Sequence, residues 1–146
     1  MKKARTFLRP LLAALAVVAV IPAAQAADYA CRQTGDIAAM PPLIPKPIHL
    51  DECTAFSGPQ ALEVGKAWCA QATNGTLGPS APPVVKVVAS CAPGAVGICR
   101  MNMGGGAVKI ERHFYVADAG TGGIANLRKT CEASAPGAPA GVFVTP

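Results

Sequence analysis

Between positions 108 and 116 the chain alternates between two kinds of residue. Val108, Ile110, Phe114 and Val116 stand at alternate positions together with one arginine, and lysine, glutamate, histidine and tyrosine fill the positions between them. Because successive side chains of a strand point to opposite faces of a sheet, this alternation predicts a strand with one buried face.

Two further strands are predicted before this one. Residues 84–90 and 98–103 are short runs rich in β-branched and apolar residues. The glycines at 104–106 supply the permissive backbone of a hairpin turn into the strand at 108–116. The three segments therefore predict a small antiparallel three-stranded meander.

Two segments on either side of these strands have apolar residues at helical spacing. Ser57 can cap the first, and Asp118 can cap the second. The apolar faces consist of Leu62, Gly65, Cys69 and Ala72 in the first segment and of Ile124, Leu127 and Cys131 in the second. Aligned on Cys69 and Cys131, the segments also match in their glycine, apolar and basic positions, which predicts an internal pseudo-repeat with one helix in each half.

The first residues form a separate segment with its own pattern. A basic start up to Arg9 is followed by the apolar run Leu11–Ile21 and by the small-residue sequence Ala24-Gln25-Ala26. This order is typical of a secretory signal peptide, and the apolar run is too short to span a bilayer. We therefore predict a signal peptide at residues 1–26, a mature start near Ala27 and no stable membrane insertion after cleavage.

The mature chain divides at the end of a proline-rich stretch. Pro41, Pro42, Pro45 and Pro47 favour extended backbone, so residues 27–52 are interpreted as an extended arm. The alternative is a polyproline ligand for a partner groove, although most such stretches are structural spacers. Residues 53–146 are predicted to form the α+β domain, ending in a flexible tail rich in proline and glycine.

Removing the signal peptide also removes most of the net charge. The full chain has 13 basic and eight acidic residues, and four of the basic ones lie within 1–26. The remaining basic residues are scattered apart from Arg128-Lys129, whereas a surface that tracks phosphates needs them clustered. We therefore expect no nucleic-acid partner.

All six cysteines lie in the mature chain, which predicts three disulfides in an exported protein. Six cysteines allow fifteen pairings, of which we favour Cys31–Cys53, Cys69–Cys91 and Cys99–Cys131. A Cys-x-x-Cys redox motif and zinc-type spacing are both lacking. The predicted fold is thus α+β, a three-stranded meander with two helices on one face, held by three disulfides.

One group of residues suggests a metal. Met101 and Met103 would share a strand face with Cys99, and His113 lies across the glycine turn from them. Thioether ligands suit Cu(I), so Met101, Met103 and His113 are the candidate ligands of a periplasmic Cu(I)-binding protein. The simpler interpretation has the methionines filling core gaps and His113 on an exposed face, with no cofactor.

Enzymatic function is not indicated. His49 and His113 are the only histidines, and hydrolase, metalloprotease and phosphate-loop motifs are missing. The carboxylates Asp51 and Glu52 are adjacent. We interpret the pair as part of a solvated turn, which is simpler than a cation site. We therefore expect no catalytic residues, with a secreted hydrolase as a remote option.

The cysteine order also carries a resemblance. Cys53-Thr-Ala-Phe-Ser-Gly58 is followed by a helix ending in Cys69, by Cys91-Ala-Pro93, by Gly97-Ile-Cys99, by the aromatic pair Phe114-Tyr115 and by a helix ending in Cys131. This order resembles that of a group of small cysteine-containing bacterial exported proteins and lipoproteins of unknown function. The resemblance implies an envelope protein and assigns no catalytic residues.

These observations favour an exported, disulfide-stabilised binding or interaction module of the bacterial envelope. We expect it in the periplasm or outside the cell, with a protein or another envelope component as its partner. The Cu(I)-binding protein is the alternative from a different functional class.

Overall fold

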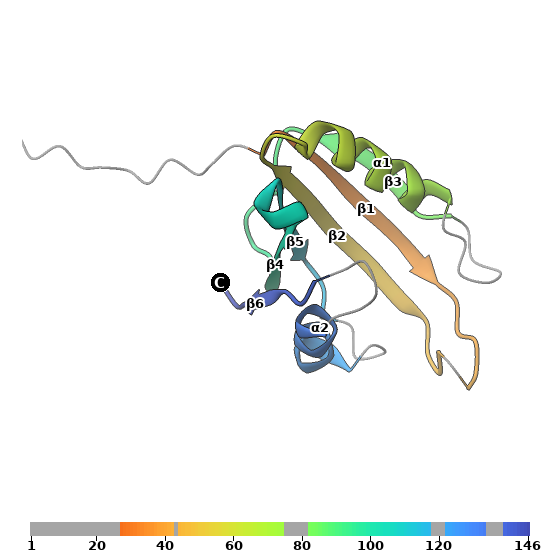
Figure 1. Cartoon of the computed structure of the whole chain (residues 1–146). Coiled ribbons are helices and arrows are strands. Elements are labelled where there is room, and N and C mark those ends of the chain that lie inside the picture. The colour runs from red at the N-terminus through yellow and green to blue at the C-terminus, as the bar shows by residue number, and fades with distance from the viewer. Residues whose placement is uncertain (1–26, 43, 75–81, 118–121, 134–138) are drawn as a thin grey trace, which may run out of the picture.

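The computed structural model describes residues 27–42, 44–74, 82–117, 122–133 and 139–146. Their elements follow the order β1 (Tyr29–Ile37), β2 (Ile48–Ser57), α1 (Ala61–Asn74), β3 (Val84–Val88), β4 (Gly97–Met103), a 3-10 turn (Gly104–Gly106), β5 (Val108–Phe114), α2 (Gly123–Glu132) and β6 (Val142–Val144). The strands form one antiparallel sheet of six in the order β3-β1-β2-β5-β4-β6, and α1 and α2 lie over separate parts of it (Figure 1). The predicted signal peptide lies outside the described residues.

The predicted three-stranded meander is wrong. The β4–β5 hairpin forms around the glycine turn as expected, but β3 pairs with β1 at the opposite edge of the sheet. Residues 27–52 do not form an arm, because they supply β1 and the first part of β2, which are central strands. The prolines lie in the connection between these strands, where the sheet needs no backbone N–H donor.

The sheet consists of two halves with the same topology. β1, β2, α1 and β3 form the first half, and β4, β5, α2 and β6 form the second. In each half the first strand lies between the other two, and β2 pairs with β5 where the halves meet. Cys31 stands opposite Thr54 and Val87, and Cys99 stands opposite Arg112 and Phe143. The predicted pseudo-repeat thus extends beyond the helix to a full ββαβ unit.

Three disulfides are present, which is the predicted number, and the described residues include no free cysteine. Cys99–Cys131 forms as predicted, whereas Cys31 pairs with Cys69 and Cys53 pairs with Cys91. The favoured Cys31–Cys53 bond is wrong. Cys31 stands opposite Thr54 and shares its face of the sheet, whereas Cys53, the neighbour of Thr54 on β2, points to the other face. Cys31–Cys69 and Cys99–Cys131 occupy corresponding positions, and each fastens a helix to the first strand of its own half.

Both helices pack on the same face of the sheet. Cys31 and Cys99 reach α1 and α2 from this face, and the register from β1 through β4 keeps them on one side. The predicted helix faces need one correction, because Leu62 and Ile124 are exposed, at 52% and 39%. The inward faces run instead through the buried Ala61, Gly65 and Cys69 in α1 and through the half-buried Gly123 and Leu127 and the buried Cys131 in α2.

Residues 89–96, hereafter the linker loop, join the two halves across the opposite face. They lead from the edge strand β3 to β4, and Cys91 is bonded to Cys53 of the central strand β2. The hydroxyl of Tyr115 donates a hydrogen bond of 2.8 Å to the carbonyl oxygen of Ala92. The linker loop is therefore fastened to the sheet by a disulfide and by hydrogen bonds, and Ala30 and Cys53 on this face are buried.

Each helix covers its own apolar core, and the core under α1 also contains Val108 and Ile110 from β5. Phe56 is fully buried under α1, and Phe114 occupies the corresponding position under α2. At other places, one core has a large residue where the other core has a small one. Tyr29 stands opposite Phe56 and contacts the helical Gly65, whereas Gly97 stands opposite Phe114 and accommodates the ring of Phe143.

Gly65→Ala is expected to destabilise the fold, although alanine is the better helix former by about 1 kcal/mol. A Cβ at position 65 would lie 2.6 Å from Cδ1 of Tyr29 and 3.1 Å from Cδ2 of Phe56. Overpacking of this kind costs roughly 1–3 kcal/mol. Urea unfolding should show a net loss, and the loss should shrink in a Tyr29→Ala background. An equal loss in both backgrounds would contradict the contact.

Candidate functional site

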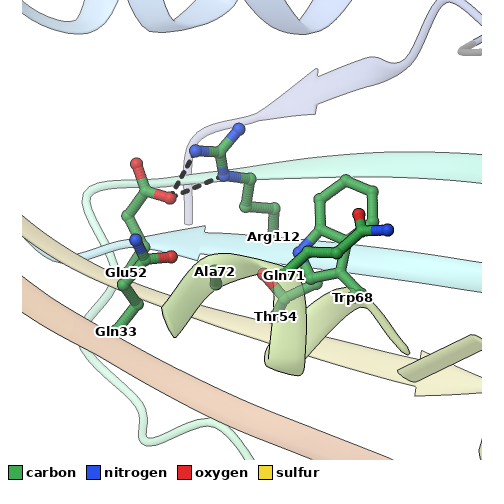
Figure 2. Close-up of a pocket in the computed structure, with 7 residues that line it drawn as sticks. All are labelled: Gln33, Glu52, Thr54, Trp68, Gln71, Ala72 and Arg112. Atoms are coloured by element: carbon green, nitrogen blue, oxygen red, sulfur yellow. Dashed lines mark hydrogen bonds and ion pairs between the residues drawn. The ribbon is translucent and has the colours of Figure 1, made fainter. Parts of the chain in front are cut away.

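A cleft of about 290 Å³ opens beside α1 over the middle of the sheet. We call it the central cleft, and it is lined by Gln33, Glu52, Thr54, Trp68, Gln71, Ala72 and Arg112. β1, β2 and β5 form its floor, and α1 forms one wall (Figure 2). α2 packs on β4 and β6 instead, so this part of the sheet face is left open.

The position of the central cleft follows from the duplication. Thr54 and Arg112 stand opposite each other where β2 pairs with β5. They also occupy corresponding places in the two halves, because Thr54 faces Cys31 and Arg112 faces Cys99. The approximate two-fold relation between the halves therefore passes between these two residues. Each helix covers its own half, and the boundary remains open as the cleft.

An ion pair fixes one side of the cleft. Nε of Arg112 donates a hydrogen bond of 2.6 Å to Oε2 of Glu52, and Nη2 of Arg112 contacts the same oxygen (Figure 2). The Glu52 side chain is 12% exposed, and the Arg112 side chain is 35% exposed. The second carboxylate oxygen, Oε1, receives no hydrogen bond from any residue that the structure describes. This oxygen is therefore available to a donor in the cleft.

One face of α1 supplies the other side. Trp68, Gln71 and Ala72 are spaced by three and four positions, which brings them to the same face of a helix. Trp68 is 37% exposed, and its ring meets the buried ring of Phe56 edge-on, with 6.1 Å between ring centroids. The contact with Phe56 holds the indole in place, while part of the ring remains open.

The lining favours recognition of an uncharged polar molecule. The amides of Gln33 and Gln71 and the hydroxyl of Thr54 can each donate and accept hydrogen bonds. The two charged side chains that the structure describes in the lining belong to one ion pair, so they neutralise each other. Among the described residues of the lining there is no histidine or cysteine, and the one carboxylate is held by a guanidinium.

The structure does not bring together the proposed copper ligands. Met101 and Met103 lie on the helix-bearing face and pack against the core under α1. His113 stands opposite Cys53 and Ile98 on β5, so its side chain points to the other face. Cys99 is consumed in a disulfide. Within the described residues, no three His, Cys, Asp or Glu side chains are grouped to hold a metal ion.

The adjacent acids Asp51 and Glu52 do not form a cation site either. They follow each other along β2 and therefore point to opposite faces, each toward a different arginine. Arg32 donates hydrogen bonds of 2.9 and 2.8 Å to Asp51, and these bonds lower the pKa of the Asp51 carboxyl. The guanidinium of Arg32 also lies over the ring of Tyr115, 4.9 Å from its centroid. Burial raises the pKa of the Tyr115 hydroxyl.

His113 is expected to make stability dependent on pH. Burial lowers the pKa of His113 from its usual value of 6.5, and the Glu111 carboxylate at 3.6 Å only partly opposes this effect. The unfolded chain therefore takes up the proton more readily than the folded one, so stability is lost as the pH falls below about 6.5. Thermal unfolding between pH 8 and pH 5 should show this loss.

A His113→Gln variant should show a smaller loss over the same pH range, because it removes the titrating group. His49→Gln is the matched control, since it deletes the only other histidine and leaves His113 in place. An unchanged pH dependence in His113→Gln would refute the assignment.

Sequence reasoning missed most of the central cleft. Gln33 and Glu52 lie in the segment interpreted as an arm, and Arg112 was assigned to a strand face without a partner. The separation of 60 positions between Glu52 and Arg112 leaves no local signal of their contact. Trp68 was the usable signal, because a lone tryptophan beside an apolar helix face needs a polar partner if it is buried.

Comparisons with known proteins assign no family to this chain. No family model, no curated protein and no solved structure matches the chain. None of the helices among the described residues is long and apolar enough to cross a membrane. The three disulfides indicate an oxidising compartment outside the cytoplasm.

Proposed function

We propose that this chain is an exported binding module of the bacterial envelope, without catalytic activity or a cofactor, and that it binds its ligand in the central cleft. The proposal rests on one observation. A partly exposed tryptophan and an ion pair that the protein forms by itself lie in the same cleft at the centre of the sheet. A concave site with a few converging polar groups is the usual form of a small-molecule site.

The fold supports binding by holding this cleft rigid. Cys31–Cys69 fastens α1, which carries Trp68 and Gln71, to the strand that carries Gln33. The floor is a paired sheet, and Glu52 and Arg112 fix each other across two of its strands. A site held in its binding conformation loses little conformational entropy when a ligand enters.

Export is the second part of the proposal. Three disulfides stabilise this domain and suit an oxidising compartment, and residues 1–26 have the order of a secretory signal peptide. The resemblance to small exported envelope proteins agrees with a periplasmic or extracellular location. Expression of the full chain in a Gram-negative bacterium should yield a periplasmic form that begins near Ala27 with all cysteines oxidised. Retention of residues 1–26 in the cytoplasmic fraction would contradict export.

Binding can be measured through Trp68, because it is the only tryptophan in the chain and it lines the cleft. The exported protein would be titrated with three panels: neutral oligosaccharides, dipeptides and organic phosphates. We expect at least one panel to protect Trp68 from acrylamide quenching and to raise the unfolding temperature. A Leu62→Ala variant, altered at an exposed site on the same helix, should respond equally. Failure of all three panels would refute binding in the cleft.

A further inference from the structure

The geometry points to a neutral saccharide as the ligand of the central cleft, with one sugar ring stacked on Trp68. This inference rests on the proposed binding function and specifies its ligand class. It follows from the aromatic surface, from the hydrogen-bonding groups around it, and from the charge and size of the cleft.

The aromatic surface is placed for stacking. Trp68 meets Phe56 edge-on, is 37% exposed as a whole residue and lines the cleft, so part of the indole is open to it. The face of an aromatic ring is electron-rich, and it attracts positively polarised hydrogen atoms. One face of a pyranose ring presents such C–H groups, so it can lie flat against the indole.

The polar groups around the indole suit hydroxyls. Gln71 lies on the same helix face as Trp68, and Gln33 and Thr54 line the floor (Figure 2). Amides and hydroxyls both donate and accept, as sugar hydroxyls do. Oε1 of Glu52 adds an acceptor, and the Arg112 N–H groups outside the ion pair add donors. A ligand with both donors and acceptors around its edge can form hydrogen bonds with all of these groups.

The charge and the size of the cleft restrict the class of ligand further. An anion approaching Arg112 would also meet the Glu52 carboxylate, and a cation approaching Glu52 would meet the guanidinium. Each charge is already balanced by its partner at 2.6 Å, so the pair gives little net attraction to an ionic ligand and a neutral molecule is favoured. The cleft volume of about 290 Å³ lies at the lower limit of small-molecule pockets, which start near ~300 Å³. This space suits one or two sugar rings.

The test uses the exported protein on an array of neutral mono- to tetrasaccharides, followed by calorimetry with the tightest array ligand. Trp68→Ala should weaken binding by roughly two- to tenfold, the loss expected for one aromatic stacking contact. Gln71→Ala should weaken it as well, and this variant changes an exposed residue and therefore keeps the fold. Leu62→Ala, on the same helix but outside the cleft, should bind like the unaltered chain.

The outcomes separate the ligand class from the binding function. A saccharide that binds Trp68→Ala and Gln71→Ala as tightly as the unaltered chain would overturn the inference. If no saccharide binds but a dipeptide or an organic phosphate protects Trp68 from quenching, the saccharide is wrong and the binding function stands. If nothing protects Trp68, both fail.

Discussion

Reduction of the three disulfides is expected to unfold the protein at room temperature. The bonds Cys31–Cys69 and Cys53–Cys91 each span 38 positions, and Cys99–Cys131 spans 32. Closing loops of this length stabilises a fold by roughly 4 kcal/mol each in the chain-entropy account. Because the whole stability of a domain is only about 5–15 kcal/mol, loss of all three bonds removes most of it. Circular dichroism in the presence of a reductant should show loss of native structure.

Two double variants separate the roles of the individual bonds. Cys31→Ser/Cys69→Ser and Cys53→Ser/Cys91→Ser open loops of the same sequence separation, so the entropic losses should match. Only the first variant detaches α1 from β1, and with α1 it loosens Trp68 in the wall of the central cleft. We expect both variants to lose stability in urea unfolding and only the first to change Trp68 fluorescence at native conditions. A reduced chain that unfolds at the same temperature as the oxidised one would contradict the role of the disulfides.

Phe56→Ala should strongly destabilise the fold and also disturb the central cleft. Phe56 is fully buried beneath α1 and supports the ring of Trp68 from below. Truncating a buried phenylalanine costs about 3–5 kcal/mol through lost burial and the cavity left behind. In addition, Trp68 loses its edge contact, so its emission should shift and its quenching by acrylamide should rise.

Phe114→Ala is the matched control for this prediction. Phe114 holds the corresponding position in the second half and is 5% exposed, but its stacked partner is Phe143. We expect a comparable loss of stability in urea unfolding with native Trp68 emission unchanged. Leu62→Ala, at an exposed site, should stay within about 0.5 kcal/mol of the unaltered protein. Equal emission changes in Phe56→Ala and Phe114→Ala would contradict the separate cores.

The parts of the fold that sequence predicted correctly are those with local signals. The alternation after Val108, the glycine turn and the helical spacing around Cys69 and Cys131 correspond to β5, the β4–β5 hairpin and the two helices. β1 gave no such signal, because Ala30 and Cys31 are neighbours on opposite faces and both are buried. The sheet is covered there by α1 on one side and by the linker loop on the other. Strands buried on both faces lose the alternation on which sequence reasoning depends.

Pairing across long separations was the second obstacle. The position of β3 beside β1, and with it the Cys53–Cys91 bond, depends on how the linker loop crosses the sheet, which no local pattern encodes. The central cleft has the same origin, since Glu52 and Arg112 meet only through the β2–β5 register. By contrast, alternation alone already placed His113 on the face opposite Phe114, where the structure has it, but the predicted exposure is wrong because the side chain is only 15% exposed.

The two-half architecture depends most directly on how the cysteines are joined, because each half is closed by its own disulfide and a third fastens the linker loop. Peptide mapping of the exported protein under non-reducing conditions tests this arrangement. The structure predicts fragments joined through Cys31–Cys69, Cys53–Cys91 and Cys99–Cys131, with no alkylated cysteine. Fragments joined through Cys31–Cys53 or Cys69–Cys91, or a free thiol at any of the six positions, would contradict the two-half architecture and the central cleft that it creates.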